Sequence, residues 1–196
     1  STLGLVDPDP RVMTMVESTC ERMASGGMYD QLAGGFARYS VDRQWVVPHF
    51  EKMLYDNAQL LSVYTSLFIQ TGSAWSQRVA TETADFLIAD MRTAQGAFAC
   101  ALDADSDDGT GHVTEGAFYS WTPTQLDEVL GADGQWAAQE LGITPQGTFE
   151  HGASVVQRRG TSPDSVRLSA CLDKLRTARQ ARPRPDRKST RLNSSH

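Results

Sequence analysis

The stretch Gly26–Asn57, GGMYDQLAGGFARYSVDRQWVVPHFEKMLYDN, decides how the rest of the chain folds. Its two glycine pairs, Gly26-Gly27 and Gly34-Gly35, predict forced bends, because glycine is used where the backbone must turn sharply or approach another group closely. Helix-to-helix connections usually have about 2–8 residues. This stretch is longer and carries many aromatic and ionisable side chains, which is typical of a loop that builds a site on a helical scaffold.

Pro48 predicts the start of a helix over residues 48–71, because proline suits the first helical position, where its missing N–H would have no partner anyway. In this interpretation His49 and Glu51 lie in the first turn. The partial positive charge of a helix N-terminus would favour a neutral imidazole at His49 and an ionised carboxylate at Glu51.

Apolar residues with helical spacing predict further helices over residues 10–25, 74–92, 123–130, 136–141 and 162–181. Two strand-like segments, 97–101 and 117–121, flank the polar loop 103–111 and predict a β-hairpin inserted between helices. Residues 144–157 have no regular pattern. Pairs of helices joined by one long loop and one short turn suit a helical barrel or stack.

The composition is that of an ordinary folded domain, with 40% hydrophobic residues among 196 and a net charge of −6. The charge is unevenly spread: 7 Lys and Arg stand against 21 Asp and Glu up to Val155, and 11 against 3 from Val156 onward. A basic end is one signature of nucleic-acid binding. We interpret this one as a solvated helix face followed by a non-native tail, and expect no nucleic-acid partner.

The sequence predicts neither a membrane partner nor an export signal. It has no apolar run of the about 18 residues that a transmembrane helix needs. Its start, STLGLVDPDPR, lacks the basic and apolar parts of a signal peptide, and lacks an initiator Met, so we expect an upstream portion. The three cysteines form no Cys-x-x-Cys motif, which is compatible with a reduced setting. We expect a cytoplasmic location.

The last eleven residues, Asp186–His196, read DRKSTRLNSSH and show no apolar pattern. The string looks like a translated DNA-sequencing adapter. We interpret residues 186–196 as a non-native tail and expect the authentic sequence to run to about Pro185.

Two segments carry a family resemblance: GGMYDQLAGGFARYSVDRQWVVPHFEKMLYDNAQL from Gly26, and AFACALDADSDDGTGHVTEGAFYSW over Ala97–Trp121. They resemble the YyaL-like family of thioredoxin-domain-containing proteins, relatives of spermatogenesis-associated protein 20. The resemblance implies a thioredoxin-like domain followed by an (α/α)6 barrel similar to N-acylglucosamine 2-epimerases and six-hairpin glycosidases. Residues 1–185 would then be a mainly α, incomplete (α/α)6 barrel with a small β-hairpin insertion, without the thioredoxin-like domain.

Candidate catalytic residues are His49 and four carboxylates. Histidine has the ordinary pKa closest to neutrality, so an epimerase-like proton abstraction could use His49. A glycosidase would instead need two facing carboxylates; the residues proposed for catalysis are His49, Glu51, Asp30, Asp103 and Asp105. The structural alternative is that His49 caps the turn and that Glu51 pairs with Arg38 or Arg43.

Aromatic and polar side chains near these residues are candidates for substrate binding, because aromatic rings stack on sugars. The set is Tyr29, Arg38, Tyr39, Trp45, Tyr55, Asp56, Glu115, Tyr119 and Trp121. The alternative is that the aromatic residues belong to the core and that Glu115 only ends a hairpin turn.

A metal site is not expected. The run Asp103-Ala-Asp105-Ser-Asp107 resembles the start of a calcium loop, but an EF-hand needs Gly at its sixth position and Glu at its twelfth. Those positions hold Asp108 and Thr114. Leu102 stands where the family resemblance leads us to expect an acidic residue. We expect no cofactor.

These observations favour an enzyme that performs acid–base chemistry on a carbohydrate or related polar metabolite, of the sugar epimerase or glycoside hydrolase type. The alternative is a non-catalytic helical module that binds a ligand or partner and is associated with a thioredoxin-like domain. A purely structural scaffold is the third interpretation.

Overall fold

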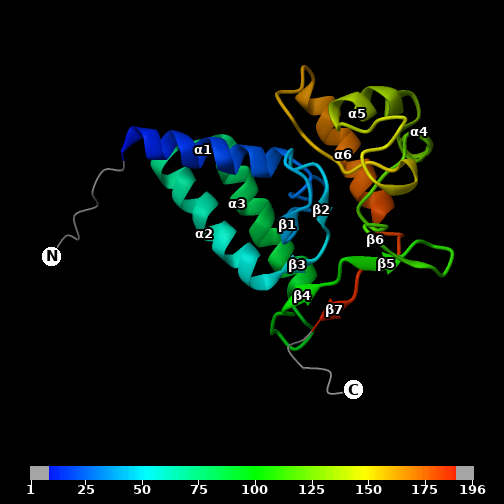
Figure 1. Cartoon of the computed structure of the whole chain (residues 1–196), viewed down its shortest axis with the longest axis horizontal. Helices are drawn as coiled ribbons and strands as arrows, with labels where there is room; N and C mark the ends of the chain where they lie inside the picture. Colours follow the sequence, from blue (N-terminus) through cyan, green and yellow to red (C-terminus); the bar gives the residue numbers. More distant parts are fainter. Residues whose placement is uncertain (1–8, 189–196) are drawn as a thin grey trace.

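The structure is a computed structural model that describes residues 9–188, and its helices form two groups joined by short strands (Figure 1). The first group consists of α1 (Pro10–Ser25), α2 (Leu54–Thr71) and α3 (Ala74–Phe86), which continues as the π-helical turn η1 (Leu87–Met91). The second group consists of α4 (Pro123–Leu130), α5 (Gly134–Glu140) and α6 (Ser165–Arg179).

The strands are short and pair antiparallel. One sheet pairs β1 (Tyr39–Ser40) with β2 (Pro48–His49), and another pairs β5 (Asp105–Asp107) with β6 (Val113–Glu115). In the third sheet, β4 (Ala101–Leu102) lies between β3 (Lys52–Met53) and β7 (Arg187–Lys188). Two 3₁₀ turns complete the regular structure, η2 (Gly131–Asp133) and η3 (Glu150–Gly152). Figure 1 shows the strands between the two helical groups.

The helical predictions for 10–25, 74–92 and 123–130 are confirmed. Asp9 caps α1 by accepting a hydrogen bond from the N–H of Arg11. Thr122 and Gln125 form a reciprocal capping box at the start of α4. The helix predicted over 136–141 is present as α5, which begins two residues earlier and ends one residue earlier, and the helix predicted over 162–181 is present as the shorter α6.

The predicted helix start at Pro48 is wrong. Pro48 and His49 form strand β2, and α2 begins only at Leu54. The Asp42 carboxylate accepts the backbone N–H groups of Val46 and Val47, at 3.1 and 2.6 Å, and this folds the chain back onto β1. His49 and Glu51 therefore lie outside any helical turn, and the helix-dipole argument for a neutral His49 does not apply.

The predicted hairpin exists, but its strands are not 97–101 and 117–121. One strand, β5, lies within the predicted polar loop 103–111 and the other, β6, directly follows it, with Asp105 opposite Glu115 and Asp107 opposite Val113. The Asp107 carboxylate accepts the N–H of Gly109 at 2.7 Å, so a side-chain hydrogen bond helps to close the turn between β5 and β6.

Two cores hold the helical groups together. Tyr64 and Val79, both fully buried, join α2 to α3, and Phe36 and Tyr29 from the long loop pack against them. The second core surrounds Trp121 and consists mainly of the apolar faces of α4, α5 and α6.

The mainly α prediction is confirmed, and the helices within residues 9–188 form no closed ring. None of the described helices is long and apolar enough to cross a membrane. Residues 187–188 pair with β4, whereas residues 189–196, the larger part of the predicted non-native tail, lie outside the described range.

Candidate functional site

Most of the predicted site residues lie in or beside a buried ion cluster or on a polar face of the molecule. The ion cluster consists of Asp30, Lys52 and Arg179. The polar face is formed by Arg38, Tyr39, His49, Glu51, Tyr55, Asp56 and Glu115.

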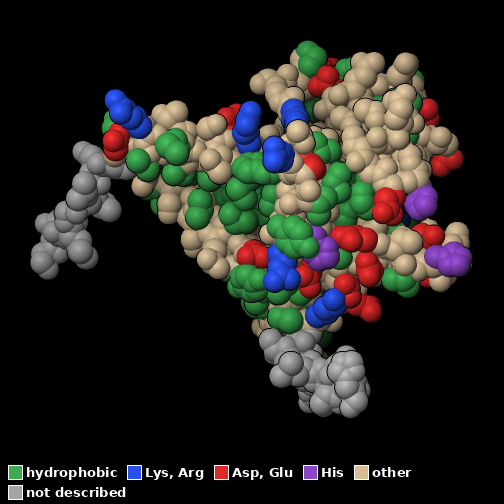
Figure 2. All heavy atoms as spheres, viewed as in Figure 1, with side chains coloured by type: hydrophobic (Ala, Val, Ile, Leu, Met, Phe, Trp, Pro, Cys, Tyr) green, Lys and Arg blue, Asp and Glu red, His purple; other side chains and the backbone are tan. Residues whose placement is uncertain are grey.

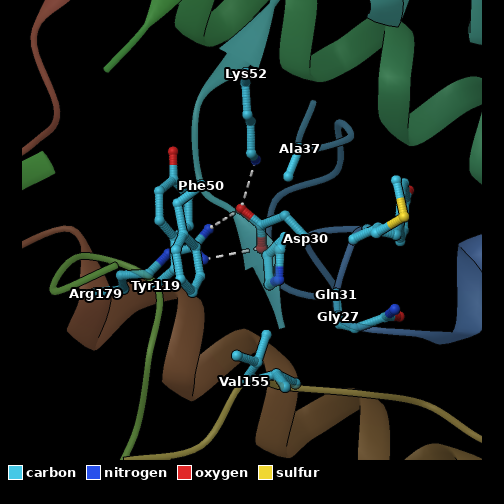
Figure 3. Close-up of a pocket in the computed structure, with 13 residues that line it drawn as sticks. Gly27, Asp30, Gln31, Ala37, Phe50, Lys52, Tyr119, Val155 and Arg179 are labelled. Carbon is cyan, nitrogen blue, oxygen red and sulfur yellow. Dashed lines mark hydrogen bonds and ion pairs between the residues drawn. The ribbon is translucent and has the colours of Figure 1, made fainter. Parts of the chain in front are cut away.

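Asp30 forms the centre of the ion cluster, with its side chain 5% exposed. Both of its carboxylate oxygens accept hydrogen bonds from Arg179, at 2.9 Å each, and Lys52 donates to one of them at 2.9 Å. Figure 3 shows Asp30 held between these two cations. Burial alone would raise the pKa of Asp30, but the charges of Arg179 and Lys52 outweigh it and hold this pKa well below its usual range.

Aromatic rings surround the two cations. The Lys52 ammonium lies 4.5 Å from the ring centre of Phe86 and 5.0 Å from that of Tyr119, and the Arg179 guanidinium lies 5.0 Å from that of Phe118. Burial lowers the pKa of Lys52, against the opposing attraction of Asp30. The three side chains are therefore held by hydrogen bonds to one another and by contacts with aromatic rings.

Lys52 and Arg179 are not among the site residues predicted from the sequence. Lys52 belongs to the stretch Gly26–Asn57, but the helix predicted over residues 48–71 does not indicate that its side chain is buried. Arg179 lies 149 residues from Asp30. It belongs to the basic C-terminal part of the chain, which the sequence predicts to be a solvated helix face. The signal that could have identified Arg179 is its spacing from the apolar residues Leu168, Cys171 and Leu175, which places it on the buried face of α6.

Two cavities adjoin the ion cluster. The smaller, of about 20 Å³, is bounded by Asp30, Phe50 and Tyr119 and is large enough for about one water molecule. The larger, of about 520 Å³, lies against Lys52, Phe86 and Arg179 and extends to the residues that follow α6. His49 and Glu51 line neither of these two cavities.

On the polar face, His49 is held between two carboxylates. Its Nδ1 lies 2.8 Å from Glu115 Oε1, which also accepts the N–H of Phe50, and its Nε2 lies 3.8 Å from Glu51 Oε2. Tyr39 stacks on the imidazole with ring centres 5.0 Å apart. A carboxylate accepts hydrogen bonds, so Nδ1 is the nitrogen that donates to Glu115.

The predicted pairing of Glu51 with Arg38 is present, at 3.0 Å. Asp56 lies beside them. Burial raises the pKa of Asp56, with Arg38 opposing the rise and Glu51 adding to it. One buried oxygen of Asp56 has no hydrogen-bond partner among residues 9–188. A carboxyl group with a raised pKa beside other charged side chains is a common feature of sites that transfer protons.

Asp103 and Asp105 lie at the edge of the polar face. Lys188 pairs with Asp103 at 2.9 Å and lies 4.0 Å from Glu51. Burial acts to raise the pKa of Asp103, but the hydrogen bond and charge of Lys188 lower it below the ordinary value. Asp105 is exposed, opposite Glu115 in the hairpin. Figure 2 shows acidic side chains and histidine gathered over this strand region.

Three predicted binding residues lie elsewhere. The Tyr29 hydroxyl donates to Glu82 within the first core. The carbonyl of Trp45 accepts the N–H of Gly27 at 2.8 Å, beside the bend at the end of α1. Trp121 is 2% exposed in the second core, with the Arg182 guanidinium 3.8 Å from its ring centre.

A cluster of three or more His, Cys, Asp or Glu side chains able to hold a metal is absent from residues 9–188. The chemistry that these groups can perform without a metal is proton transfer at His49 and Asp56, and stacking or hydrogen bonding through Tyr39, Tyr55 and Arg38.

The fold and the site define a mainly α-helical protein with a polar face built on a glycine-rich loop. No family model matches the chain. It is 35% identical to spermatogenesis-associated protein 20 of Homo sapiens over 213 residues, and 34% identical to that of Mus musculus over 212 residues. Each match covers 92% of this chain and 27% of the relative.

The resemblance predicted from the two motifs is thereby confirmed, and the chain belongs to the spermatogenesis-associated protein 20-like family. It spans about a quarter of the length of these curated relatives, since the matches cover 27% of the human protein and 26% of the rat protein.

Proposed function

We propose that this chain contributes the proton-transfer part of a site for a carbohydrate or related polar metabolite, in a protein whose helix pairs belong to an (α/α)6 barrel. The observation that carries the proposal is the pairing of His49 Nδ1 with Glu115 at 2.8 Å. A carboxylate that fixes one ring nitrogen as a donor leaves the other nitrogen to accept a proton. His49 Nε2 is then the general base.

The neighbours of His49 supply the remaining functions. Tyr39, stacked on the imidazole, and Tyr55 are about half exposed, at 49% and 48%. Their rings would stack on a sugar, while Arg38 would donate hydrogen bonds to its hydroxyl groups. Asp56, with its raised pKa, would hold a proton as the general acid.

The geometry favours an epimerase-type reaction over glycoside hydrolysis. Glycosidases need two carboxyl groups that face each other across the scissile bond. Here Glu51 pairs with Arg38, and Asp30 pairs with Lys52 and Arg179. An arginine or lysine partner stabilises the ionised form of a carboxylate, so neither group is free to act as a proton donor.

The reaction is tested by incubating the 196-residue chain with reducing sugars in D₂O and following the proton next to the carbonyl carbon by NMR. We expect its exchange for deuterium, which His49→Ala would abolish. His112→Ala is the matched control, because His112 is exposed on the β5–β6 turn. Exchange that persists in His49→Ala, or is absent with every sugar, would contradict the proposal.

One observation favours the second candidate, a partner-binding module. Met13, Val16, Val63 and Leu67 of α1 and α2 line a groove of about 300 Å³, and Figure 2 shows hydrophobic side chains over these helices. In that case the thioredoxin-like domain implied by the resemblance would bind there. Val63→Glu would abolish this binding, measured by calorimetry, and His49→Ala would not.

A further inference from the structure

The buried ion cluster carries more positive than negative charge. One carboxylate, that of Asp30, faces two cations, and the side chains of Lys52 and Arg179 are only 4% and 5% exposed. Lys52 donates to Asp30 and to the Gly34 carbonyl, at 2.9 and 3.0 Å. An ammonium has three hydrogens, so within residues 9–188 one of them has no hydrogen-bond acceptor. A buried charge without full compensation is costly.

The larger cavity lies against these uncompensated cations. Lys52, Leu102 and Arg187 are neighbours across β3, β4 and β7, and all three line the cavity. Successive side chains of a strand point to opposite faces of the sheet, so Lys188 points to the other face, where it pairs with Asp103. The cavity measures about 520 Å³, within the range of about 300–1,000 Å³ that is usual for small-molecule sites.

The charged side chains that line this cavity are unequal in sign. Outside residues 186–196, which we interpret as a non-native tail, four are basic, namely Lys52, Arg176, Arg179 and Arg184, and two are acidic, namely Asp30 and Asp90. Asp90 is already paired with Arg184 at 2.7 Å. Two positive charges therefore remain in excess.

Tyr119 provides an independent indication of a ligand. It is 7% exposed and lines the cavity, and its hydroxyl has no hydrogen bond with any described residue. Burial raises the pKa of Tyr119, and the Asp30 carboxylate adds to the rise, so the hydroxyl keeps its proton and can donate it to an acceptor. Arg176, on the cavity rim, likewise has no ion-pair partner among residues 9–188.

We propose that the 520 Å³ cavity between α6, η1 and the β3–β4–β7 sheet binds the phosphate group of a small phosphate monoester. A phosphate monoester near pH 7 carries up to two negative charges and three acceptor oxygens, which match the two excess cations and the free donors of Tyr119 and Arg176. This site lies apart from His49, and it does not depend on the proposed proton-transfer function.

Calorimetry on the 196-residue chain at low ionic strength, with glycerol 3-phosphate as the probe, tests the proposal. We expect binding that weakens as salt is added. Gluconate, which has a single negative charge, should bind at least about tenfold more weakly, because it leaves one cation uncompensated. Equal binding of gluconate would overturn the assignment to a phosphate.

Two variants and one control locate the site. Arg176→Gln should weaken glycerol 3-phosphate binding by about tenfold or more, because it removes a charged hydrogen bond. Tyr119→Phe should weaken it by about threefold to tenfold, because it removes a neutral hydrogen bond. Arg11→Gln, at the exposed start of α1, should leave binding unchanged. Arg176 is exposed and Phe retains the ring of Tyr119, so both variants should fold, which circular dichroism would check. No binding to the folded chain, or equal binding by all variants, would overturn the proposal.

Discussion

The guanidinium of Arg179 forms two parallel hydrogen bonds of 2.9 Å with the carboxylate of Asp30, across 149 residues of sequence. Asp30 lies in the loop after α1 and Arg179 at the end of α6, so this pair ties the first helical group to the second. A bidentate Arg–carboxylate pair fixes orientation as well as distance. The ion cluster therefore fixes the position of the two helical groups relative to each other beside the larger cavity.

Asp30→Asn should destabilise the chain by about 3–5 kcal/mol, because removing one partner of a buried ion pair leaves the others uncompensated. Urea unfolding followed by circular dichroism would measure the loss. Asp173→Asn is the matched control, since Asp173 is exposed on the same helix as Arg179; we expect a change within about 0.5 kcal/mol. Equal effects of the two substitutions would show that the cluster adds no stability.

The stability conferred by Asp30 should disappear in acid. Its pKa is lower in the folded than in the unfolded chain, where it is about 3.9, so below that value the unfolded chain binds more protons. Its contribution is complete above the unfolded pKa and is lost as the pH falls toward the folded one. The difference in unfolding free energy between the natural chain and Asp30→Asn should shrink by up to about 1.4 kcal/mol per pH unit below about pH 4. A difference that stays constant between neutral pH and the acid limit of folding would refute this.

Gly35→Ala should be more damaging than Gly72→Ala. Both glycines have positive φ, +80° and +66°, so both substitutions pay the cost of a left-handed backbone. An added Cβ at Gly35 would lie 2.4 Å from the ring of Phe86, whereas one at Gly72 would meet nothing within 4 Å. We expect Gly35→Ala to lose about 1–3 kcal/mol more than Gly72→Ala, measured by urea unfolding. Equal losses would mean that the close approach to Phe86 relaxes without cost.

The sequence predicted the helices and the bends well, because both depend on local chemistry. Asp9-Pro10 and Thr122-Pro123 cap and start helices through groups only a few residues apart. The forced bend at Gly34-Gly35 is confirmed by positive φ at both glycines.

The strand β2 and the ion cluster could not be predicted, because both depend on contacts between distant segments. Proline can begin either a helix or a strand. Here the backbone N–H groups of Val46 and Val47 donate to Asp42, which turns the chain so that Pro48 pairs with β1 as a strand. The buried Lys52 ammonium donates to the Asp30 carboxylate and to the Gly34 carbonyl, 22 and 18 residues away in the sequence. Periodicity within α6 places Arg179 on the buried face, but it does not identify Asp30 as the partner.

The tautomer of His49 is the most direct test of the proposed proton-transfer site. Long-range ¹H–¹⁵N correlation NMR on the ¹⁵N-labelled chain, with His49→Gln used to assign the signals, would show which ring nitrogen carries the proton. We predict that the neutral form of the imidazole is protonated at Nδ1, and that Glu115→Ala shifts it toward the Nε2-protonated tautomer. A His49 that is protonated at Nε2 in the unaltered chain, or that is indifferent to the loss of Glu115, would contradict the account.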